Sequence, residues 1–142
     1  PYVQAACFCD MIIEDKTGVM SLIRVVDTLT HVEAGPDAPE EMPPVHYPLK
    51  LVLMLKSGSA RGRSDLVLTP ELPTGEKEKP THLTVHFEGE ERGQNLILNV
   101  SFVFNLEGLY WFHVHVDGQK LTSIPLRVKY SRIVATATSR VQ

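Results

Sequence analysis

Apolar and polar side chains alternate with a period of two along much of the chain, most clearly toward its C-terminal end. Residues 105–130 hold two such runs, joined at Asp117-Gly118. This alternation is typical of half-buried strands, and Asp-Gly supplies the positive φ angles that a tight primed turn requires. The segment therefore predicts a β-hairpin. We expect its buried positions to be Tyr110, Phe112, Val114 and Val116, and its outward positions to be Trp111, His113 and His115.

Strand-like patterns recur upstream, separated by polar turns. The candidate strands are residues 3–14, 19–32, 49–55, 65–68, 81–88 and 96–104. Residues 19–32 also fit the spacing of an amphipathic helix, through Leu22, Val25, Val26 and Leu29. Because Val, Ile and Thr fill this segment and Gly18 precedes it, we favour a strand.

About eight strands without helices between them predict an all-β fold. We expect two antiparallel sheets packed face to face, as in an immunoglobulin-like β-sandwich. A chain of 142 residues suits a single domain, which we place at residues 1–130. Residues 131–142 would then form a C-terminal edge strand or a tail. Pro125 within the last strand indicates a sheet edge, where a missing amide donor costs little.

Residues 33–48 differ abruptly from their surroundings. They contain five prolines and four acidic residues but no Lys or Arg. Long loops in compact domains are usually functional or disordered, which makes this segment a candidate binding element. A stiff, solvated crossover between two sheets is the alternative.

The composition is that of an ordinary soluble globular protein, with 43% hydrophobic residues, 22% charged residues and a formal net charge of −3. Because Lys and Arg are scattered among more numerous acids, we expect no nucleic-acid partner. No apolar run reaches the roughly 20 residues that span a bilayer, so we expect no membrane partner either.

The N-terminal segment lacks the pattern of a secretory signal, and Cys7 and Cys9 stand too close on one strand for a mutual disulfide. These features favour the cytoplasm.

The sequence carries no catalytic or cofactor fingerprint, so we expect a non-enzymatic protein without a cofactor. His113-Val114-His115 is the nearest approach to a metal motif, since two imidazoles at i and i+2 share one face of a strand. Cupins use such a pair, but the glutamate that a cupin would place about four residues later is missing. Directing both histidines inward would also expose four large apolar side chains. Trp111, on the same outward face, is a candidate anchor for a partner.

Several blocks of the chain resemble a family of uncharacterised bacterial proteins, catalogued as a domain of unknown function and built as an immunoglobulin-like β-sandwich. The blocks are Cys9-Asp10 with Ile12-Ile13, Asp15-Lys16-x-Gly18, Ser21-Leu22-Ile23-Arg24-Val25-x-Asp27, Gly108-x-Tyr110-x-Phe112-x-Val114-x-Val116-Asp117-Gly118, and Pro125-Leu126-x-Val128. One departure is Asn105-Leu106, which stands where the resemblance would place Phe-Pro. The resemblance implies the fold and a bacterial cytosol, and it implies no activity or site residue.

We therefore hypothesise a β-sandwich that binds a protein partner or forms a homo-oligomer. The surface would be the sheet face around Trp111, His113 and His115, or the loop at residues 33–48. One alternative is a metal-binding protein or metal-dependent enzyme that uses His113 and His115. A second alternative is a carbohydrate-binding module that uses the exposed Trp111.

Overall fold

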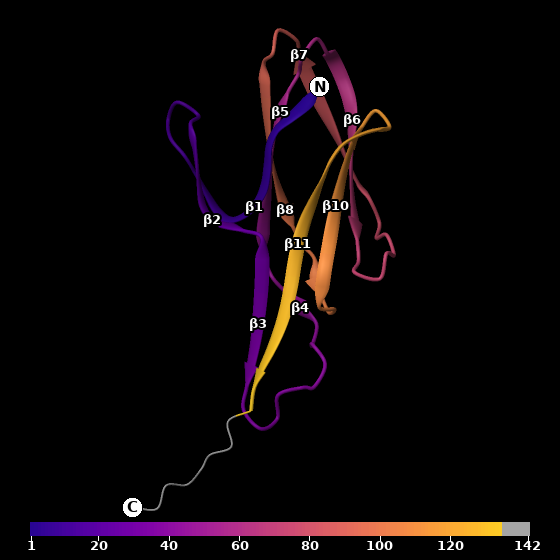
Figure 1. The fold of residues 1–142 in the computed structure, drawn as a ribbon. Coiled ribbons are helices and arrows are strands. Elements are labelled where there is room, and N and C mark those ends of the chain that lie inside the picture. Colours follow the sequence, from indigo (N-terminus) through magenta and orange to yellow (C-terminus); the bar gives the residue numbers. More distant parts are fainter. Residues whose placement is uncertain (135–142) are drawn as a thin grey trace, which may run out of the picture.

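The computed structural model describes residues 1–134, whose strands form three sheets (Figure 1). The first sheet has the order β2-β1-β5-β8, with β1 at Tyr2–Glu14, β2 at Met20–Val26, β5 at Leu49–Lys56 and β8 at Gly93–Val100. The second has the order β3-β11-β10-β6-β7, with β3 at Thr28–Ala34, β6 at Arg61–Glu71, β7 at Thr81–Glu88, β10 at Gly108–Val116 and β11 at Gln119–Ile133. The third pairs β4 at Val45–His46 with β9 at Val103–Phe104. The expected all-β class is confirmed, since residues 1–134 contain no helix.

One hydrophobic core joins the two larger sheets. Phe8 of β1 meets Phe112 of β10 edge to face, with 4.9 Å between the ring centroids. The buried side chains that these two central strands direct into the core are Leu49, Leu51, Leu53 and Leu55 of β5, and Tyr110, Phe112, Val114 and Val116 of β10. The inward positions expected for β10 are thus confirmed. Burying each such side chain stabilises the fold by about 1.5–3 kcal/mol.

The Asp117-Gly118 turn joins β10 to β11 as expected. Both residues have positive φ, at 49° and 82°. The turn is also tied to β6, because the Asp117 amide donates to the carbonyl of Asp65 at 2.9 Å and the Asp65 amide donates to Asp117 Oδ1 at 2.8 Å. The hydrogen bond from the Asp65 amide, helped by one from Ser64, holds the pKa of Asp117 below its ordinary value.

Three details of the sequence-based fold are corrected. Residues 19–32 form neither a helix nor one continuous strand, because the chain leaves the first sheet after β2 and enters the second as β3. The sheets are also not antiparallel throughout. β3 pairs parallel with β11, from Thr28 opposite Arg127 to Ala34 opposite Ile133, since the chain changes sheets at Asp27 without a reversing hairpin. The part of the chain that is described holds eleven strands rather than about eight.

Pro125 lies in a strand that is not at the edge of its sheet. β11 stands between β3 and β10, but its pairing with β3 begins only at Arg127. At Pro125 itself, β11 is therefore paired with β10 alone, where Pro125 lies opposite Trp111. The sheet edge that the proline predicted is present at this position, although not along the whole strand. β11 continues to Ile133, while residues 135–142 of the expected edge strand or tail lie outside the described residues.

The proline-rich segment at residues 33–48 is tied to the end of β11. The Gly35 amide donates to the carbonyl of Ile133 at 2.9 Å, and the Tyr130 hydroxyl donates to the carbonyl of Pro39 at 2.6 Å. The segment includes the end of β3 and the short strand β4, so it is not wholly a loop. These contacts support the interpretation of a stiff crossover between sheets.

β1 and β2 extend beyond their sheet as a two-stranded arm (Figure 1). Pairing of β1 with β5 stops at Cys9, whereas pairing with β2 continues to Glu14 opposite Met20. We call residues 10–24 the arm. Its turn is held by Asp15, whose carboxylate accepts hydrogen bonds from the Thr17 side chain at 2.6 Å and from the Val19 amide at 3.0 Å.

Candidate functional site

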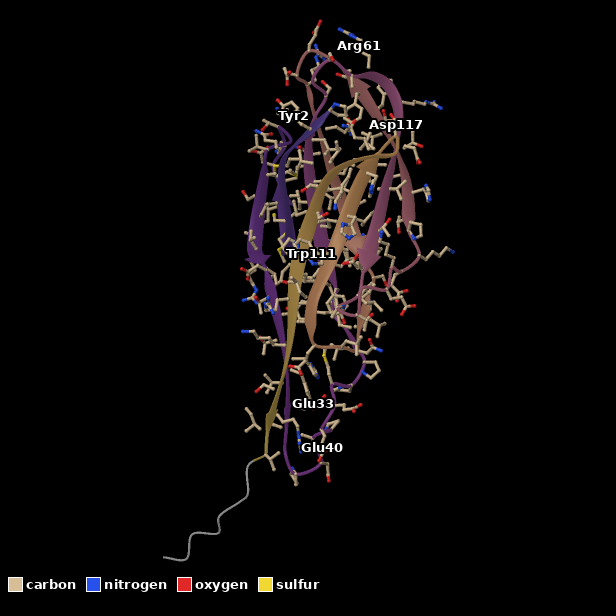
Figure 2. All side chains as sticks on the ribbon, turned by 45° about the vertical axis from the view of Figure 1, so that its right-hand side comes forward. Tyr2, Glu33, Glu40, Arg61, Trp111 and Asp117 are labelled. Carbon is tan, nitrogen blue, oxygen red and sulfur yellow. The ribbon has the colours of Figure 1, made fainter. Side chains whose placement is uncertain are left out.

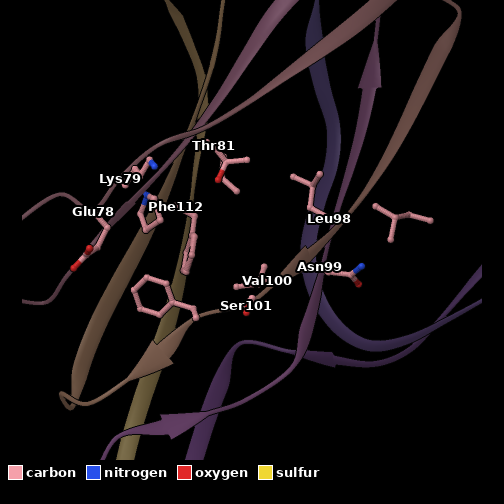
Figure 3. A pocket seen from close by; sticks show the side chains of 12 residues that line it. Glu78, Lys79, Thr81, Leu98, Asn99, Val100, Ser101 and Phe112 are labelled. Carbon is pink, nitrogen blue, oxygen red and sulfur yellow. The ribbon is translucent and has the colours of Figure 1, made fainter.

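A groove opens between β7 and β8, where the two larger sheets fail to close against each other. Within the described residues β8 pairs only with β5, and β7 pairs only with β6. One backbone edge of each strand is therefore free. The groove beside these edges has a volume of about 360 Å³ (Figure 3).

The groove has an apolar wall and a polar rim. Its apolar lining comes from both sheets and from the segment after β8, and consists of Leu68, Pro70, Ile97, Leu98, Val100, Phe102 and Phe112. Its polar lining consists of Glu78, Lys79, Thr81, Asn99 and Ser101. Figure 3 shows Phe112 directed into the opening from β10, and Leu98 and Val100 on β8 at the other side. Such a mixture of apolar interior and few polar groups is typical of binding sites, which have volumes of about 300–1,000 Å³.

From its alternating pattern, part of this wall would be predicted to lie in the buried core. Leu96, Leu98, Val100, Phe102 and Phe104 alternate as a core-facing ladder, yet only Phe104 is fully buried. The others are half-buried because β8 ends its sheet and no strand of the second sheet covers it. Alternation reports which side chains face inward but not which strand stands at an edge, so the sequence carried no signal for the groove.

Trp111, His113 and His115 lie together on the outer face of the second sheet, as the sequence predicts. All three are half-buried. Trp111 stands between its two cross-strand neighbours, Pro125 of β11 and Glu71 of β6. Figure 2 shows Trp111 over the ribbons of β10 and β11. The role of these three residues in binding a partner or a carbohydrate stays a prediction.

Both ring nitrogens of His113 are engaged by side chains of neighbouring strands. Nδ1 is hydrogen-bonded to Ser123 Oγ at 2.7 Å, and Nε2 lies 3.4 Å from Glu71 Oε1. The His113 side chain is only 14% exposed, so these contacts fix the ring between β6 and β11. A metal ion at His113 would have to displace one of these two partners.

The outer face of the second sheet also carries His82 and His86, on β7. His82 Nδ1 lies 3.4 Å from Asp65 Oδ2. Across residues 1–134 no group of three or more His, Cys, Asp or Glu side chains is arranged to hold a metal ion. Metal binding by His113 and His115 therefore gains no support from their surroundings and stays a prediction.

Cys7 and Cys9 are free thiols on β1. Burial raises the pKa of both, and for Cys9 the nearby Cys7 adds to the effect. A thiol with a raised pKa stays protonated at neutral pH and is a poor nucleophile. The two residues therefore act as small apolar side chains on the outer side of the first sheet.

The comparisons with known proteins give structural neighbours but no curated relative. No curated protein matches the chain. Among solved structures, it is similar to Pseudomonas fluorescens alkylpurine DNA glycosylase AlkC bound to DNA containing an abasic site analog, with 10% sequence identity and a TM-score of 0.48. The match covers 87% of this chain, which spans 30% of the length of that protein.

This neighbour corrects the sequence-based exclusion of nucleic acid from the partners. The exclusion rested on scattered charge, and a protein that matches most of this chain is seen bound to DNA. The exclusion is therefore withdrawn, because scattered charge alone does not rule out nucleic acid. At this TM-score the likeness carries no argument about what this chain itself binds.

Among the residues described, no helix is long and apolar enough to cross a membrane.

A family model matches residues 4–129, which is nearly the whole described chain. The model covers both larger sheets, the arm, the groove and the outward histidines. Its description assigns no activity, ligand or partner. The chain belongs to DUF6941, a family of unknown function.

Proposed function

We propose that this protein is a non-enzymatic binding module that takes an extended, partly apolar polypeptide segment into the groove between β7 and β8. The observation that carries the proposal is the free backbone edge of β8 beside an apolar groove of about 360 Å³. In strand addition, main-chain hydrogen bonds to a free edge supply affinity, and pockets for alternate side chains supply specificity. The groove offers both features at one place.

The side chains along β8 support an extended ligand. Leu96, Leu98 and Val100 face the interior and are half-buried, with polar Asn95 and Asn99 on the other side of the strand. A strand added to β8 would place every second side chain against Leu98, Val100 and Phe102. Its remaining side chains would face water beside Asn99. The ligand is therefore expected to alternate apolar and polar residues.

The binding test uses a displayed library of random ten-residue peptides, followed by titration of a selected synthetic peptide into labelled protein observed by NMR. We expect selected peptides to alternate apolar and polar residues. The amides of β8 should shift and gain protection from hydrogen exchange, because new main-chain hydrogen bonds form there. A small apolar ligand would instead shift the methyl groups of Leu98 and Val100 without protecting amides, and this outcome would contradict strand addition.

The matched variants are Val100→Phe, which fills the groove, and Thr84→Phe, which adds the same ring to the outer face of β7. Val100 is half-buried in the groove wall, so a larger side chain has room there. We expect Val100→Phe to weaken binding of the selected peptide at least tenfold, which is a loss of about 1.4 kcal/mol. Thr84→Phe should leave the affinity unchanged. Equal affinities for the two variants would place the peptide elsewhere and refute the proposal.

The proposal includes an immunoglobulin-like arrangement of the two larger sheets. The Tyr110 hydroxyl supports it, because it donates to the carbonyl of Leu106 at 2.8 Å and accepts from the Leu106 amide at 3.2 Å. A tyrosine that bonds back to the backbone a few residues upstream is a hallmark of immunoglobulin-like sandwiches. The corner forms with Asn105-Leu106 in place of the Phe-Pro that the resemblance led us to expect.

A bacterial cytoplasmic location also belongs to the proposal. Two free cysteines separated by one residue on the same strand suit a reducing compartment. Fractionation of a bacterial host followed by thiol labelling tests this assignment. We expect both thiols to react in the soluble cytoplasmic fraction after unfolding, and recovery from the periplasm would contradict it.

A further inference from the structure

We propose that the outer face of the second sheet holds a binding site for a neutral sugar, in a shallow hollow beside Trp111. The hollow has a volume of about 300 Å³ and is lined by Glu71, Trp111, His113, Lys120 and Ser123. Small-ligand sites have volumes of about 300–1,000 Å³, so this one suits a small ligand. Trp111 and Phe112 point to opposite sides of β10, and the hollow is therefore separate from the peptide groove that Phe112 lines.

The floor of the hollow is held by hydrogen bonds between neighbouring strands. His113 Nδ1 and Ser123 Oγ are 2.7 Å apart, and His113 Nε2 lies 3.4 Å from Glu71 Oε1. The side chains of His113 and Glu71 are only 14% and 25% exposed, and their strands lie in the interior of the sheet. Polar groups that are fixed in this way lose little freedom when a ligand binds to them.

A β-bulge in β11 directs Lys120 to the same face. The pairing of β10 with β11 shifts after Val114, so that His115 lies opposite Lys120 and Leu121 has no partner residue on β10. With strict alternation from Ser123, Leu121 would face outward and Lys120 inward. The bulge instead packs Leu121 against the core and leaves Lys120 exposed. Bulges often redirect a side chain beside a functional site.

The groups that the hollow leaves open for a ligand are a carboxylate oxygen, an ammonium and an aromatic ring. In the described part of the chain, Glu71 Oε2 has no hydrogen-bond partner, and no ion pair or hydrogen bond engages the ammonium of Lys120. The indole of Trp111 borders both. A matching ligand donates and accepts hydrogen bonds through neighbouring groups and also has an apolar face.

A pyranose ring meets these requirements. Each hydroxyl both donates and accepts, so adjacent hydroxyls can donate to Glu71 and accept from Lys120. Hydrogen bonds to charged groups are stronger than those between neutral groups. The C–H groups on one face of the ring carry a slight positive charge and can pack against the negative face of the Trp111 indole.

Other classes of ligand suit the hollow less well. A phosphate would meet the carboxylate of Glu71 together with the ammonium of Lys120, which removes most of the attraction. A peptide strand has no free backbone edge to pair with, because β10 lies between β6 and β11. Trp111 is the one large apolar side chain of the lining, which is too little apolar surface for the centre of a protein interface.

Trp111 is the only tryptophan of the chain, so its fluorescence reports on the hollow directly. The test is a titration of the full chain with the methyl glycosides of glucose, galactose, mannose and N-acetylglucosamine, and with sorbitol and glucuronate. We expect at least one methyl glycoside to give a saturable change with a dissociation constant of about 1 mM, as suits a ligand of about a dozen heavy atoms. Sorbitol has hydroxyls but no ring to pack on the indole, and should bind at least about tenfold more weakly.

Three outcomes of this titration overturn the proposal. The first is the absence of a saturable change with every methyl glycoside. The second is an affinity for sorbitol equal to that for the methyl glycosides, which would show that no sugar ring is recognised. The third is tighter binding of glucuronate than of any methyl glycoside, which would make the ligand an anion rather than a neutral sugar.

The matched variants are Glu71→Gln and Glu88→Gln. Both remove a carboxylate from the outer face of the second sheet, but only Glu71 lines the hollow. We expect Glu71→Gln to weaken binding of the tightest methyl glycoside about fivefold, because a charge-assisted hydrogen bond is lost, and Glu88→Gln to leave it unchanged. Thermal melts check that both variants fold. Equal affinities for the two variants would place the sugar elsewhere and overturn the proposal.

The Val100→Phe variant, which fills the peptide groove, keeps the two sites apart in the test. It should bind the methyl glycoside as tightly as the unaltered protein does, because Val100 does not line the hollow. Failure of sugar binding and failure of peptide binding are therefore distinguishable.

Discussion

The two outer faces of the molecule differ in chemistry, although both belong to sheets that share one core. The outer face of the second sheet carries charged and imidazole side chains, among them Arg63, Asp65, Glu71, His82, His86, His113 and Arg127. The outer face of the first sheet carries Met11, Ile13, Ile23, Val25 and Ile97, all more than a third exposed. An antiparallel sheet ordinarily keeps one face on the core and one solvated. The second sheet follows this rule and the first does not.

The difference teaches that the two outer faces provide different surroundings for the side chains that lie on them. On the second sheet, polar side chains bond to one another, as His113 does with Ser123. The first sheet has apolar side chains on both sides of β1, with Phe8 in the core and Met11 outside it. A sheet that is apolar on both faces is expected to be covered on both.

A carboxylate introduced at the centre of each outer face should lower the free energy of unfolding by very different amounts. Val52→Asp puts a charge at a position that is 1% exposed, whereas Thr69→Asp puts one on the half-buried, polar face of β6. We expect Val52→Asp to lower the free energy of unfolding by about 3 kcal/mol and Thr69→Asp by less than about 1 kcal/mol. Urea unfolding measures both. Similar losses would mean that the two faces do not differ in environment.

The polar network of the second sheet should contribute a smaller, measurable amount. Ser123→Ala removes the partner of His113 Nδ1 and leaves a half-buried ring nitrogen without its 2.7 Å contact. We expect a loss of about 1 kcal/mol in the free energy of unfolding. Ser21→Ala on the exposed outer side of the arm is the control, and it should change stability by less than about 0.5 kcal/mol. A neutral Ser123→Ala would show that the network does not stabilise this face.

The turns of the two sheets should respond differently to acid. The amide of Asp65 holds the pKa of Asp117 below its ordinary value, and the side chain of Thr17 does the same for Asp15. A carboxyl group with a depressed native pKa contributes stability above its unfolded pKa, and the contribution is lost as the pH falls through the native pKa. The advantage of the unaltered protein over Asp117→Asn should therefore be full at pH 7, should begin to fall near the ordinary pKa of 3.8, and should disappear only below the lower native pKa.

Asp15→Asn should leave global unfolding nearly unchanged, because the arm does not pack against the core. Its effect should be confined to faster hydrogen exchange within residues 10–24, which local opening of the arm produces. Urea unfolding across pH, combined with exchange measured by NMR, separates the two variants. A global loss for Asp15→Asn equal to that for Asp117→Asn would mean that the arm folds as part of the core.

The sequence predicts much of the second sheet and little of what distinguishes the first. Alternation and Asp117-Gly118 place the inward residues of β10 correctly, because both signals are local. The parallel pairing of β3 and the open edge of β8 depend on strand order, which alternation does not encode. The half-burial of Leu98 and Val100 follows from that order. No local pattern distinguishes these residues from core.

The outer face of the first sheet did leave a trace in the sequence. Met11-Ile12-Ile13 is an uninterrupted apolar run within a strand, and such runs indicate that both faces are covered. Interpreting residues 3–14 as a simple alternating strand overlooked it. The outward placement of Trp111, His113 and His115 was predictable for the opposite reason, since a strict alternation leaves only one inward set.

The most direct test of the difference between the two outer faces is a solvent paramagnetic relaxation measurement by NMR. An uncharged soluble gadolinium complex relaxes protons in proportion to their exposure. The account predicts that the methyl groups of Ile13, Ile23 and Val25 are relaxed as strongly as the side-chain protons of His82, His86 and Thr84, while the methyl groups of Val52 are hardly relaxed. Weak relaxation at Ile13, Ile23 and Val25 would contradict it.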